Sequence, residues 1–144
     1  MEWENIPNDV ENWFGFVYCI ERLNAKNSEK RYYWGCKQFI SNLRLPPLKG
    51  KTRKRKVIKQ SDWRKYYGSS EELKKDVLLH GKDNFKRTIL KLCTCKWQLK
   101  YEELKIQMHN NVLLRDDVYN GIIHVRINHP PKSLKEHYKL ESSL

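Results

Sequence analysis

The sequence predicts a small α+β domain in which helices flank a three-stranded, mostly antiparallel sheet. Its 144 residues fit a single domain. Three segments, 13–22, 31–36 and 85–92, are rich in aliphatic and aromatic residues and predict strands. Two further segments between residues 69 and 109 repeat apolar residues at helical spacing. Because a short polar segment joins the first two strands, we expect them to form an antiparallel hairpin that helices can cover.

The first strand, 13–22, is apolar on both of its alternating faces, which indicates a strand covered from both sides. The polar segment after it contains Asn24, Asn27 and Ser28, which favour a turn. The second strand begins at Arg31. The two faces of the first strand are Phe14, Phe16, Tyr18 and Ile20 on one side, and Trp13, Gly15, Val17 and Cys19 on the other.

Two helical elements are predicted between the second and third strands. A short amphipathic turn over 37–44 must end before Pro46, because the residue before a proline avoids helical backbone angles. Ser69 and Glu72 have the spacing of a capping box, so a helix is expected to begin after Ser69. Gly81 is suited to end that helix.

The helix predicted for 94–109 has two apolar sides, which is typical of a helix buried between two layers. Beyond Asn120 the sequence has a weak alternating run, and after Pro130-Pro131 it is polar and expected to fray. One side of the helix carries Trp97, Tyr101, Leu104 and Met108, and the other carries Leu99 and Ile106; the alternating run is Ile122, Ile123, Val125 and Ile127.

The composition points to a polyanionic partner. The chain has 29 Lys and Arg against 17 Asp and Glu, a net charge of +12, which is unusual for an enzyme of small metabolites and favours nucleic acid. Apolar residues make up 39% of the chain, so global disorder is excluded. No segment has the length of a membrane helix or the pattern of a secretory signal, so we expect a cytoplasmic protein without a membrane partner. The cysteines Cys19, Cys36, Cys93 and Cys95 lack zinc-site spacing and are expected to be buried thiols in a reducing compartment.

Most of the net positive charge lies between Arg44 and Lys65, where ten basic residues are accompanied by one acid, Asp62. Such a segment is expected either to contact DNA phosphates or to be a solvated linker. The residues predicted to bind DNA are Lys49, Lys51, Arg53, Lys54, Arg55, Lys56, Lys59, Arg64 and Lys65.

A series of motifs follows the order of the predicted elements. Phe16-Val17-Tyr18 and Tyr33-Trp34-Gly35 lie on the hairpin, and 63–70 reads Trp-Arg-Lys-Tyr-Tyr-Gly-Ser-Ser. Downstream come His80-Gly81, Asn84-Phe85, the helical stretch 99–104 and Tyr119-Asn120. This series resembles the GIY-YIG nuclease family, in the form found in small phage-encoded, homing-type endonucleases, and it covers about 13–120.

The resemblance implies hydrolysis of phosphodiester bonds in double-stranded DNA, with Mg²⁺ or Mn²⁺ as the cofactor and no small-molecule cofactor. Glu103 matches the acid that binds the metal, and one carboxylate with waters and a phosphate oxygen suits Mg²⁺. Tyr18 matches the tyrosine that activates water or relays its proton, and a nearby cation would favour its phenolate. Tyr33 matches the second tyrosine of the site, and Asn120 matches the asparagine that steadies it.

Several assignments stay open at the level of sequence. Tyr66 matches a family position near the nucleophile, with Tyr67 as a rival. The family arginine is expected at Leu43, so Arg44 or Lys37 is the candidate cation for the scissile phosphate. Glu102 and Glu103 flank the same apolar stripe, and only the family register favours Glu103. Phe16 and Trp34 also depart from the motif. Core packing would explain Tyr18 and Tyr33 equally well, and a simple turn would explain Asn120-Gly121.

The expected organisation is an N-terminal extension, 1–12, a nuclease-like domain, 13–120, with a basic insertion at 45–62, and a C-terminal extension, 121–144. A non-catalytic nucleic-acid-binding module and a structural RNA-associated protein are the alternatives to a nuclease. If the gene is carried by a phage, the site of action is the host cytoplasm. A symmetric double-strand cutter would be a dimer, and the sequence leaves the oligomeric state open.

Overall fold

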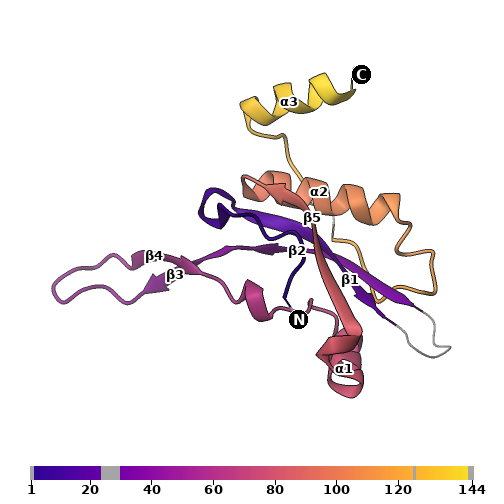
Figure 1. Ribbon diagram of the computed structural model, residues 1–144. Helices are drawn as coiled ribbons and strands as arrows, with labels where there is room; N and C mark the ends of the chain where they lie inside the picture. The colour runs from indigo at the N-terminus through magenta and orange to yellow at the C-terminus, as the bar shows by residue number, and fades with distance from the viewer. Residues whose placement is uncertain (1, 24–29, 125, 143–144) are drawn as a thin grey trace.

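The computed structural model describes residues 2–23, 30–124 and 126–142. Its centre is an antiparallel sheet of β1 (Gly15–Arg22), β2 (Arg31–Gln38) and β5 (Phe85–Cys93), in the order β2-β1-β5 (Figure 1). The predicted α+β class with a three-stranded antiparallel sheet is therefore confirmed. The turn predicted around Asn24, Asn27 and Ser28 lies outside the described residues, as does Val125 of the alternating run.

The middle strand β1 has the predicted two-sided burial. Phe16, Tyr18 and Ile20 are fully buried on one face, and Val17 is buried on the other. β1 pairs with β2 so that Tyr18 lies opposite Gly35, and with β5 so that Tyr18 lies opposite Ile89. The register against β5 shifts between Val17 and Tyr18, which is a bulge beside the tyrosine.

The face that carries Tyr18 is covered by Trp3, by the short helical turn η2 (Trp63–Lys65) and by α1 (Glu71–His80). Ser70, not Ser69, caps α1, because its hydroxyl accepts from the Leu73 backbone N–H at 3.3 Å. Gly81 ends α1 as predicted, with a positive φ of 86°. Two further short turns are η1 (Val10–Asn12) and η3 (Lys82–Asn84).

The opposite face is covered by α2 (Lys96–His109), whose Leu99 and Ile106 pack against Val17 and Cys93. The larger predicted stripe faces the other way. Trp97 and Tyr101 stack on each other and contact Tyr138 of α3 (Lys132–Ser142), whereas Met108 is 60% exposed. The polar C-terminal stretch expected to fray is thus a helix, because Tyr138 has an aromatic surface on α2 to cover (Figure 1). None of the described helices is long and apolar enough to cross a membrane.

The prediction of a short helical turn over 37–44 is wrong. This part of the chain instead forms strand β3 (Ile40–Leu45), which pairs antiparallel with β4 (Arg55–Gln60). Phe39 separates β2 from β3 and is buried against Phe16 and Trp63, which anchors the start of β3. The two strands form a separate sheet that extends away from the central one (Figure 1). We call residues 40–60 the ribbon.

Candidate active site at the edge of β2

Three tyrosines from separate parts of the chain meet on the α1 face of the sheet. The ring centroids of Tyr33 and Tyr66 each lie 6.1 Å from that of Tyr18. Tyr66 interacts through its hydroxyl with the hydroxyls of Tyr18 and Ser69, and Tyr33 forms a hydrogen bond of 2.8 Å with Ser69. The structure therefore connects Tyr18, Tyr66, Ser69 and Tyr33 through their hydroxyl groups. Tyr67, the sequence rival of Tyr66, is buried in the core and is contacted by Arg87.

Two glycines make room for this tyrosine cluster. A Cβ atom at Gly35 would lie 2.7 Å from the Tyr18 hydroxyl and 3.0 Å from the Tyr33 ring. Gly68 has φ +84°, and a Cβ atom there would lie 3.0 Å from the Tyr33 ring. The glycines in the two motifs are thus explained by the close approach of backbone to aromatic rings.

Burial changes the acid–base expectation for Tyr18. The side chain is 1% exposed, and desolvation raises its pKa well above the ordinary value, with Tyr33 and Tyr66 adding to the effect. Burial also raises the pKa of Tyr66. This loss of hydration opposes the Tyr18 phenolate that we expected a neighbouring cation to favour. Tyr18 is a neutral hydroxyl that can pass or donate a proton.

Lys37 supplies a cation beside these hydroxyls. Its ammonium lies 4.1 Å from the centre of the Tyr66 ring and 2.7 Å from a carboxylate oxygen of Asp62. Lys37 hydrogen-bonding lowers the pKa of Asp62. Arg44, the other candidate cation, lies on β3, is exposed and pairs across the ribbon with Lys56. The structure thus brings Lys37, and not Arg44, to the tyrosines.

The outer edge of β2 is where the carboxylate and the asparagine meet the strand. The Tyr32 N–H donates to the Asp117 carbonyl at 2.9 Å. The next outward N–H, that of Trp34, donates to Asn120 Oδ1 at 3.0 Å, and Asn120 Nδ2 donates to the Trp34 carbonyl at 2.7 Å. Asn120 therefore continues the pairing of the strand edge with its side chain.

The following outward amide, that of Cys36, interacts with the Glu103 carboxylate, as does the Cys36 thiol. Because residues 34 and 36 project from the same strand edge, Asn120 and Glu103 meet it about 7 Å apart along the strand. Partial burial raises the pKa of Glu103, while these contacts with Cys36 oppose the rise. The same burial, with Glu103 nearby, raises the pKa of the Cys36 thiol. Cys36 is thus a neutral donor to Glu103.

The structure separates the two carboxylates that the helical pattern left equivalent. Glu102 accepts a hydrogen bond from the Tyr138 hydroxyl of α3. Glu103 turns instead to the edge of β2. There it lines a pocket of about 350 Å³, the edge pocket, together with Tyr33, Ser69, Ser70, Gln107, Tyr119, Asn120, Gly121, Ile122 and His124. Tyr33, Glu103 and Asn120 are therefore brought together, with Tyr18 and Tyr66 behind Tyr33.

A second pocket of about 280 Å³ lies further along the same strand. Three lysines, Lys37, Lys96 and Lys100, line it, and we call it the lysine pocket. Cys36 belongs to this pocket and also contacts Glu103, so the two pockets are neighbours along β2. Ile40 and Ser41, at the start of the ribbon, complete one wall. A polyanion lying along this edge would meet Glu103 first, then the lysines and then the ribbon.

Some of these residues were missed by sequence reasoning. Lys96 and Lys100 have helical i,i+4 spacing, which places them on one side of α2, but nothing local distinguishes them from other surface lysines. Ser69 was assigned to the helix cap, and its bond to Tyr33 depends on the fold. Gln107 is buried and donates to the Trp34 carbonyl at 3.0 Å. A buried glutamine on a helix has no sequence signature.

The donor set near Glu103 bears on metal binding. In the described part of the chain no group of three or more His, Cys, Asp and Glu side chains is arranged to hold a metal ion. A site with one carboxylate is nevertheless the type that suits Mg²⁺, which retains several waters and binds substrate phosphate. Glu103 lines the edge pocket, and burial raises its pKa although Cys36, His124 and Lys100 oppose the rise. Its chemistry fits a single divalent ion.

The protein is an α+β domain whose antiparallel sheet carries a cluster of tyrosines, with a carboxylate from α2 at the edge of β2. A family model described as "Putative endonuclease segE, GIY-YIG domain" matches residues 2–123. The chain belongs to this GIY-YIG nuclease family. Comparisons with curated proteins and with solved structures gave no match.

Proposed function

We propose that this protein is an endonuclease that hydrolyses phosphodiester bonds of double-stranded DNA with a divalent metal ion, Mg²⁺ or Mn²⁺. The observation that supports it most is the edge pocket, in which Tyr33 and Glu103 face the same space although they come from β2 and α2. The membership of a nuclease family makes phosphodiester hydrolysis the reaction to test first.

Glu103 would hold the metal ion, and the Asn120 amide fixes the strand edge beside it. A bound divalent ion supplies charge neutralisation at a phosphate oxygen and a water of lowered pKa. Asn120 is a positioning residue in this scheme, because both of its polar atoms are already bonded to Trp34. His124 lines the same pocket and interacts favourably with the Glu103 charge.

Lys37 would place a positive charge against the scissile phosphate, assisted by Lys96 and Lys100 of the lysine pocket. An ammonium near a phosphoryl group stabilises the negative charge that develops in the transition state. Tyr33, with its hydroxyl bonded to Ser69, faces the edge pocket and would orient the attacking water. Tyr18 and Tyr66, held neutral by burial, would carry a proton along the connected hydroxyls.

DNA affinity would come from the exposed basic residues of the ribbon and of η2. Every phosphate contact made by Lys or Arg increases the steepness of the salt dependence. The residues that we propose to contact DNA are Lys49, Lys51, Arg53, Lys54, Arg55, Lys56, Lys59, Arg64 and Lys65, all of which are exposed.

The test is cleavage of supercoiled plasmid with Mg²⁺, with Mn²⁺ and with EDTA. We expect nicked or linear product only when metal is present. Glu103→Gln should lower the rate by about 100-fold or more, because it removes the metal ligand. Glu102→Gln is the matched control, since it changes the adjacent carboxylate that contacts Tyr138 instead. Cleavage that persists in Glu103→Gln would show that the site assignment is wrong.

A second readout does not depend on turnover. Mg²⁺ binding to the folded state should raise the Tm of the wild type and of Glu102→Gln, but not that of Glu103→Gln. A protein that binds DNA and cleaves it under no metal condition would instead be the non-catalytic binding module.

The finer biological role that we propose is that of a small homing-type or phage DNA-processing endonuclease. It rests on the motif series and on the name of the matched family. Such a protein would act in the cytoplasm, and in the host cytoplasm if a phage encodes it.

A further inference from the structure

The ribbon is a two-stranded structure that stands on its own. β3 and β4 pair from Ile40↔Gln60 to Leu45↔Arg55 and form a sheet separate from the central one. It projects away from the rest of the domain (Figure 1). A solitary hairpin is only marginally stable in water. The length and exposure of this strand pair therefore suggest that it has a binding function.

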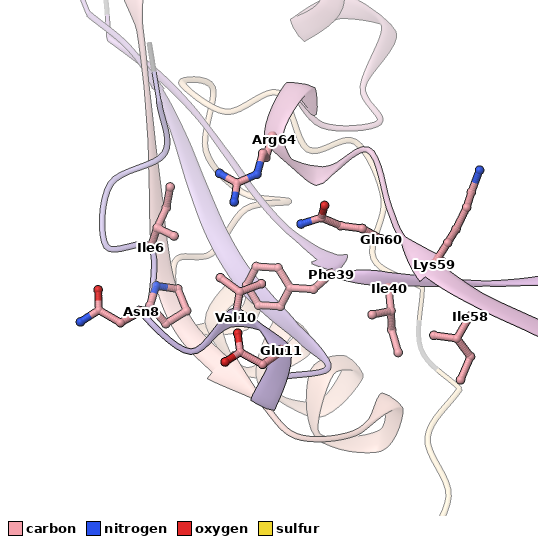
Figure 2. A pocket seen from close by; sticks show the side chains of 11 residues that line it. Ile6, Asn8, Val10, Glu11, Phe39, Ile40, Ile58, Lys59, Gln60 and Arg64 are labelled. Carbon is pink, nitrogen blue, oxygen red and sulfur yellow. The ribbon is translucent and has the colours of Figure 1, made fainter.

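The root of the ribbon is fixed to the core. Phe39 is 1% exposed, and its carbonyl accepts from the Ser61 N–H at 2.9 Å. The Ser61 hydroxyl donates to the Gln38 carbonyl at 2.6 Å. A pocket of about 530 Å³ lies between this root and the N-terminal segment, with Ile40 and Ile58 on one wall and Arg64 nearby (Figure 2). The direction of the ribbon relative to β2 is therefore defined by these contacts.

The two faces of the ribbon have different chemistry, because side chains alternate along each strand. One face carries Leu43, Leu45 and Val57 at its centre, of which Leu45 and Val57 are half-buried, with Ser41, Arg55 and Lys59 around them. The other face presents two exposed cross-strand pairs, Asn42↔Ile58 and Arg44↔Lys56. Figure 2 shows this alternation near the root, where Ile58 and Lys59 point to opposite sides.

The exposed face has the side chains that read base edges in DNA. In the major groove an arginine or a lysine contacts guanine N7 and O6, an asparagine pairs with adenine N6 and N7, and an apolar group contacts the thymine methyl. All three types lie on one surface of the ribbon: the cations Arg44 and Lys56, the amide of Asn42 and the apolar Ile58. The segment 40–60 contains no Asp or Glu, so nothing in it repels phosphate.

The width of a two-stranded ribbon also fits the major groove of DNA. The major groove of B-DNA is about 12 Å wide and admits a two-stranded antiparallel ribbon, whereas the minor groove is about 6 Å wide. The ribbon also starts at the wall of the lysine pocket, so a duplex whose backbone lies along that pocket has its groove within reach of β3 and β4.

We propose that the ribbon enters the major groove of the DNA substrate and that Asn42, Arg44, Lys56 and Ile58 read its base sequence. This inference rests on the proposed function only for the identity of the substrate as duplex DNA. The chain from Lys37 to Arg44 spans seven residues, at most about 23 Å when extended. The cut should therefore lie at a fixed position within about 7 bp of the bases that Arg44 contacts.

The test selects bound duplexes from a random pool with the Glu103→Gln protein in EDTA, so that no cleavage is needed. We expect enrichment of a short motif. Arg44→Ala and Asn42→Ala should each relax base preference by about tenfold at one position. Arg55→Ala, on the opposite face, is the matched control. It should keep the motif, weaken all sequences equally and lower the log–log salt slope by about one.

A second measurement leaves the protein unchanged. Replacing guanine and adenine in the motif by their 7-deaza analogues removes major-groove N7 acceptors and should weaken binding about tenfold. Replacing guanine by inosine alters only the minor groove and should have little effect. The deep, narrow major groove of RNA excludes a ribbon, so an RNA duplex of the same sequence should not compete.

Three results would overturn the proposal. They are the absence of an enriched motif, a motif unchanged by Arg44→Ala and Asn42→Ala, and binding that is sensitive to inosine but not to 7-deazapurines. A protein that selects a motif but cleaves under no metal condition would reject the proposed function and leave the ribbon proposal standing.

Discussion

Asn120 and Glu103 bind adjacent outward positions of the same strand, Asn120 at Trp34 and Glu103 at Cys36. One residue uses an amide that can satisfy both a donor and an acceptor of the backbone. The other uses an ionised carboxylate, which can only accept and whose two oxygens offer about four lone-pair sites, more than two donors from Cys36 occupy. This difference in hydrogen-bonding capacity separates a residue that positions the edge from one that can bind a cation.

Replacing Asn120 should loosen the edge of β2. Asn120→Ala leaves the buried Trp34 N–H without its acceptor, which should lower the free energy of unfolding by about 1–3 kcal/mol. The Trp34 carbonyl keeps a partner in this variant, because Gln107 still donates a hydrogen bond to it. Urea denaturation measures the change. Asn128→Ala, at an exposed position, is the control and should alter stability by less than about 0.5 kcal/mol. Equal stability of both variants would contradict the edge-pairing role.

Gly35→Ala should disturb the tyrosine cluster directly. The new methyl group would lie 2.7 Å from the Tyr18 hydroxyl, and overpacking of this kind costs about 1–3 kcal/mol. We expect a lower Tm and a loss of cleavage beyond what the fraction unfolded explains. Gly121→Ala is the matched control for stability, because a Cβ atom there meets nothing within 4 Å. If Gly35→Ala were as stable as Gly121→Ala and cleaved DNA at the wild-type rate, the close approach of Gly35 to Tyr18 would not matter for function.

Replacing Lys37 and replacing Arg44 should change different kinetic parameters. Lys37→Ala removes the ammonium beside Tyr66 and should reduce kcat by about 100-fold, with DNA affinity changed little. Arg44→Ala should instead raise KM and leave kcat near the wild-type value, because Arg44 lies on the ribbon. Single-turnover cleavage at saturating DNA gives kcat, and a binding titration gives affinity. The reverse pattern would show that Arg44, and not Lys37, is the catalytic cation.

Glu103 should make stability depend on pH. Its pKa is raised in the folded state by burial, so the folded protein binds a proton there more tightly than the unfolded chain. The stability associated with this proton is present below the ordinary pKa of glutamate and is lost as pH rises through the raised value. Glu103→Gln should therefore have a higher Tm than the wild type at pH 8, and the two should agree near pH 4. Thermal unfolding without divalent metal measures this, and a Tm difference that grew toward acid would contradict it.

The core of the fold was predictable because its signals are local. The alternation of 13–22, the cap and glycine around α1 and the stripe of Leu99 and Ile106 each lie within one segment. The ribbon was not predictable in this way, because β3 and β4 pair across nine intervening residues and carry charges where a buried strand would have apolar groups. α3 was not predicted for a similar reason, because the aromatic partners of its Tyr138 lie about forty residues earlier in the chain.

The candidate site was likewise predictable only in part. The motif order pointed to Tyr18, Tyr33, Glu103 and Asn120, and the structure places the last three around one pocket. The choice between Lys37 and Arg44 depended on whether 37–44 was a helix or a strand. A helix would have kept Arg44 about 10 Å from Lys37 along the chain, whereas an extended chain can carry it about 23 Å away. Lys96 and Lys100 join Lys37 only because α2 packs across β2.

The ribbon leaves the core after Phe39 and returns at Ser61, and these two residues are joined by a backbone hydrogen bond. This junction holds the entry and exit of the chain independently of the residues further out along the ribbon. If the ribbon reads the DNA sequence as proposed, grafting a different 42–58 segment onto the same Phe39–Ser61 junction should redirect the protein to another DNA target while leaving the walls of the lysine pocket in place. On this view, relatives would diverge in target fastest between these two residues.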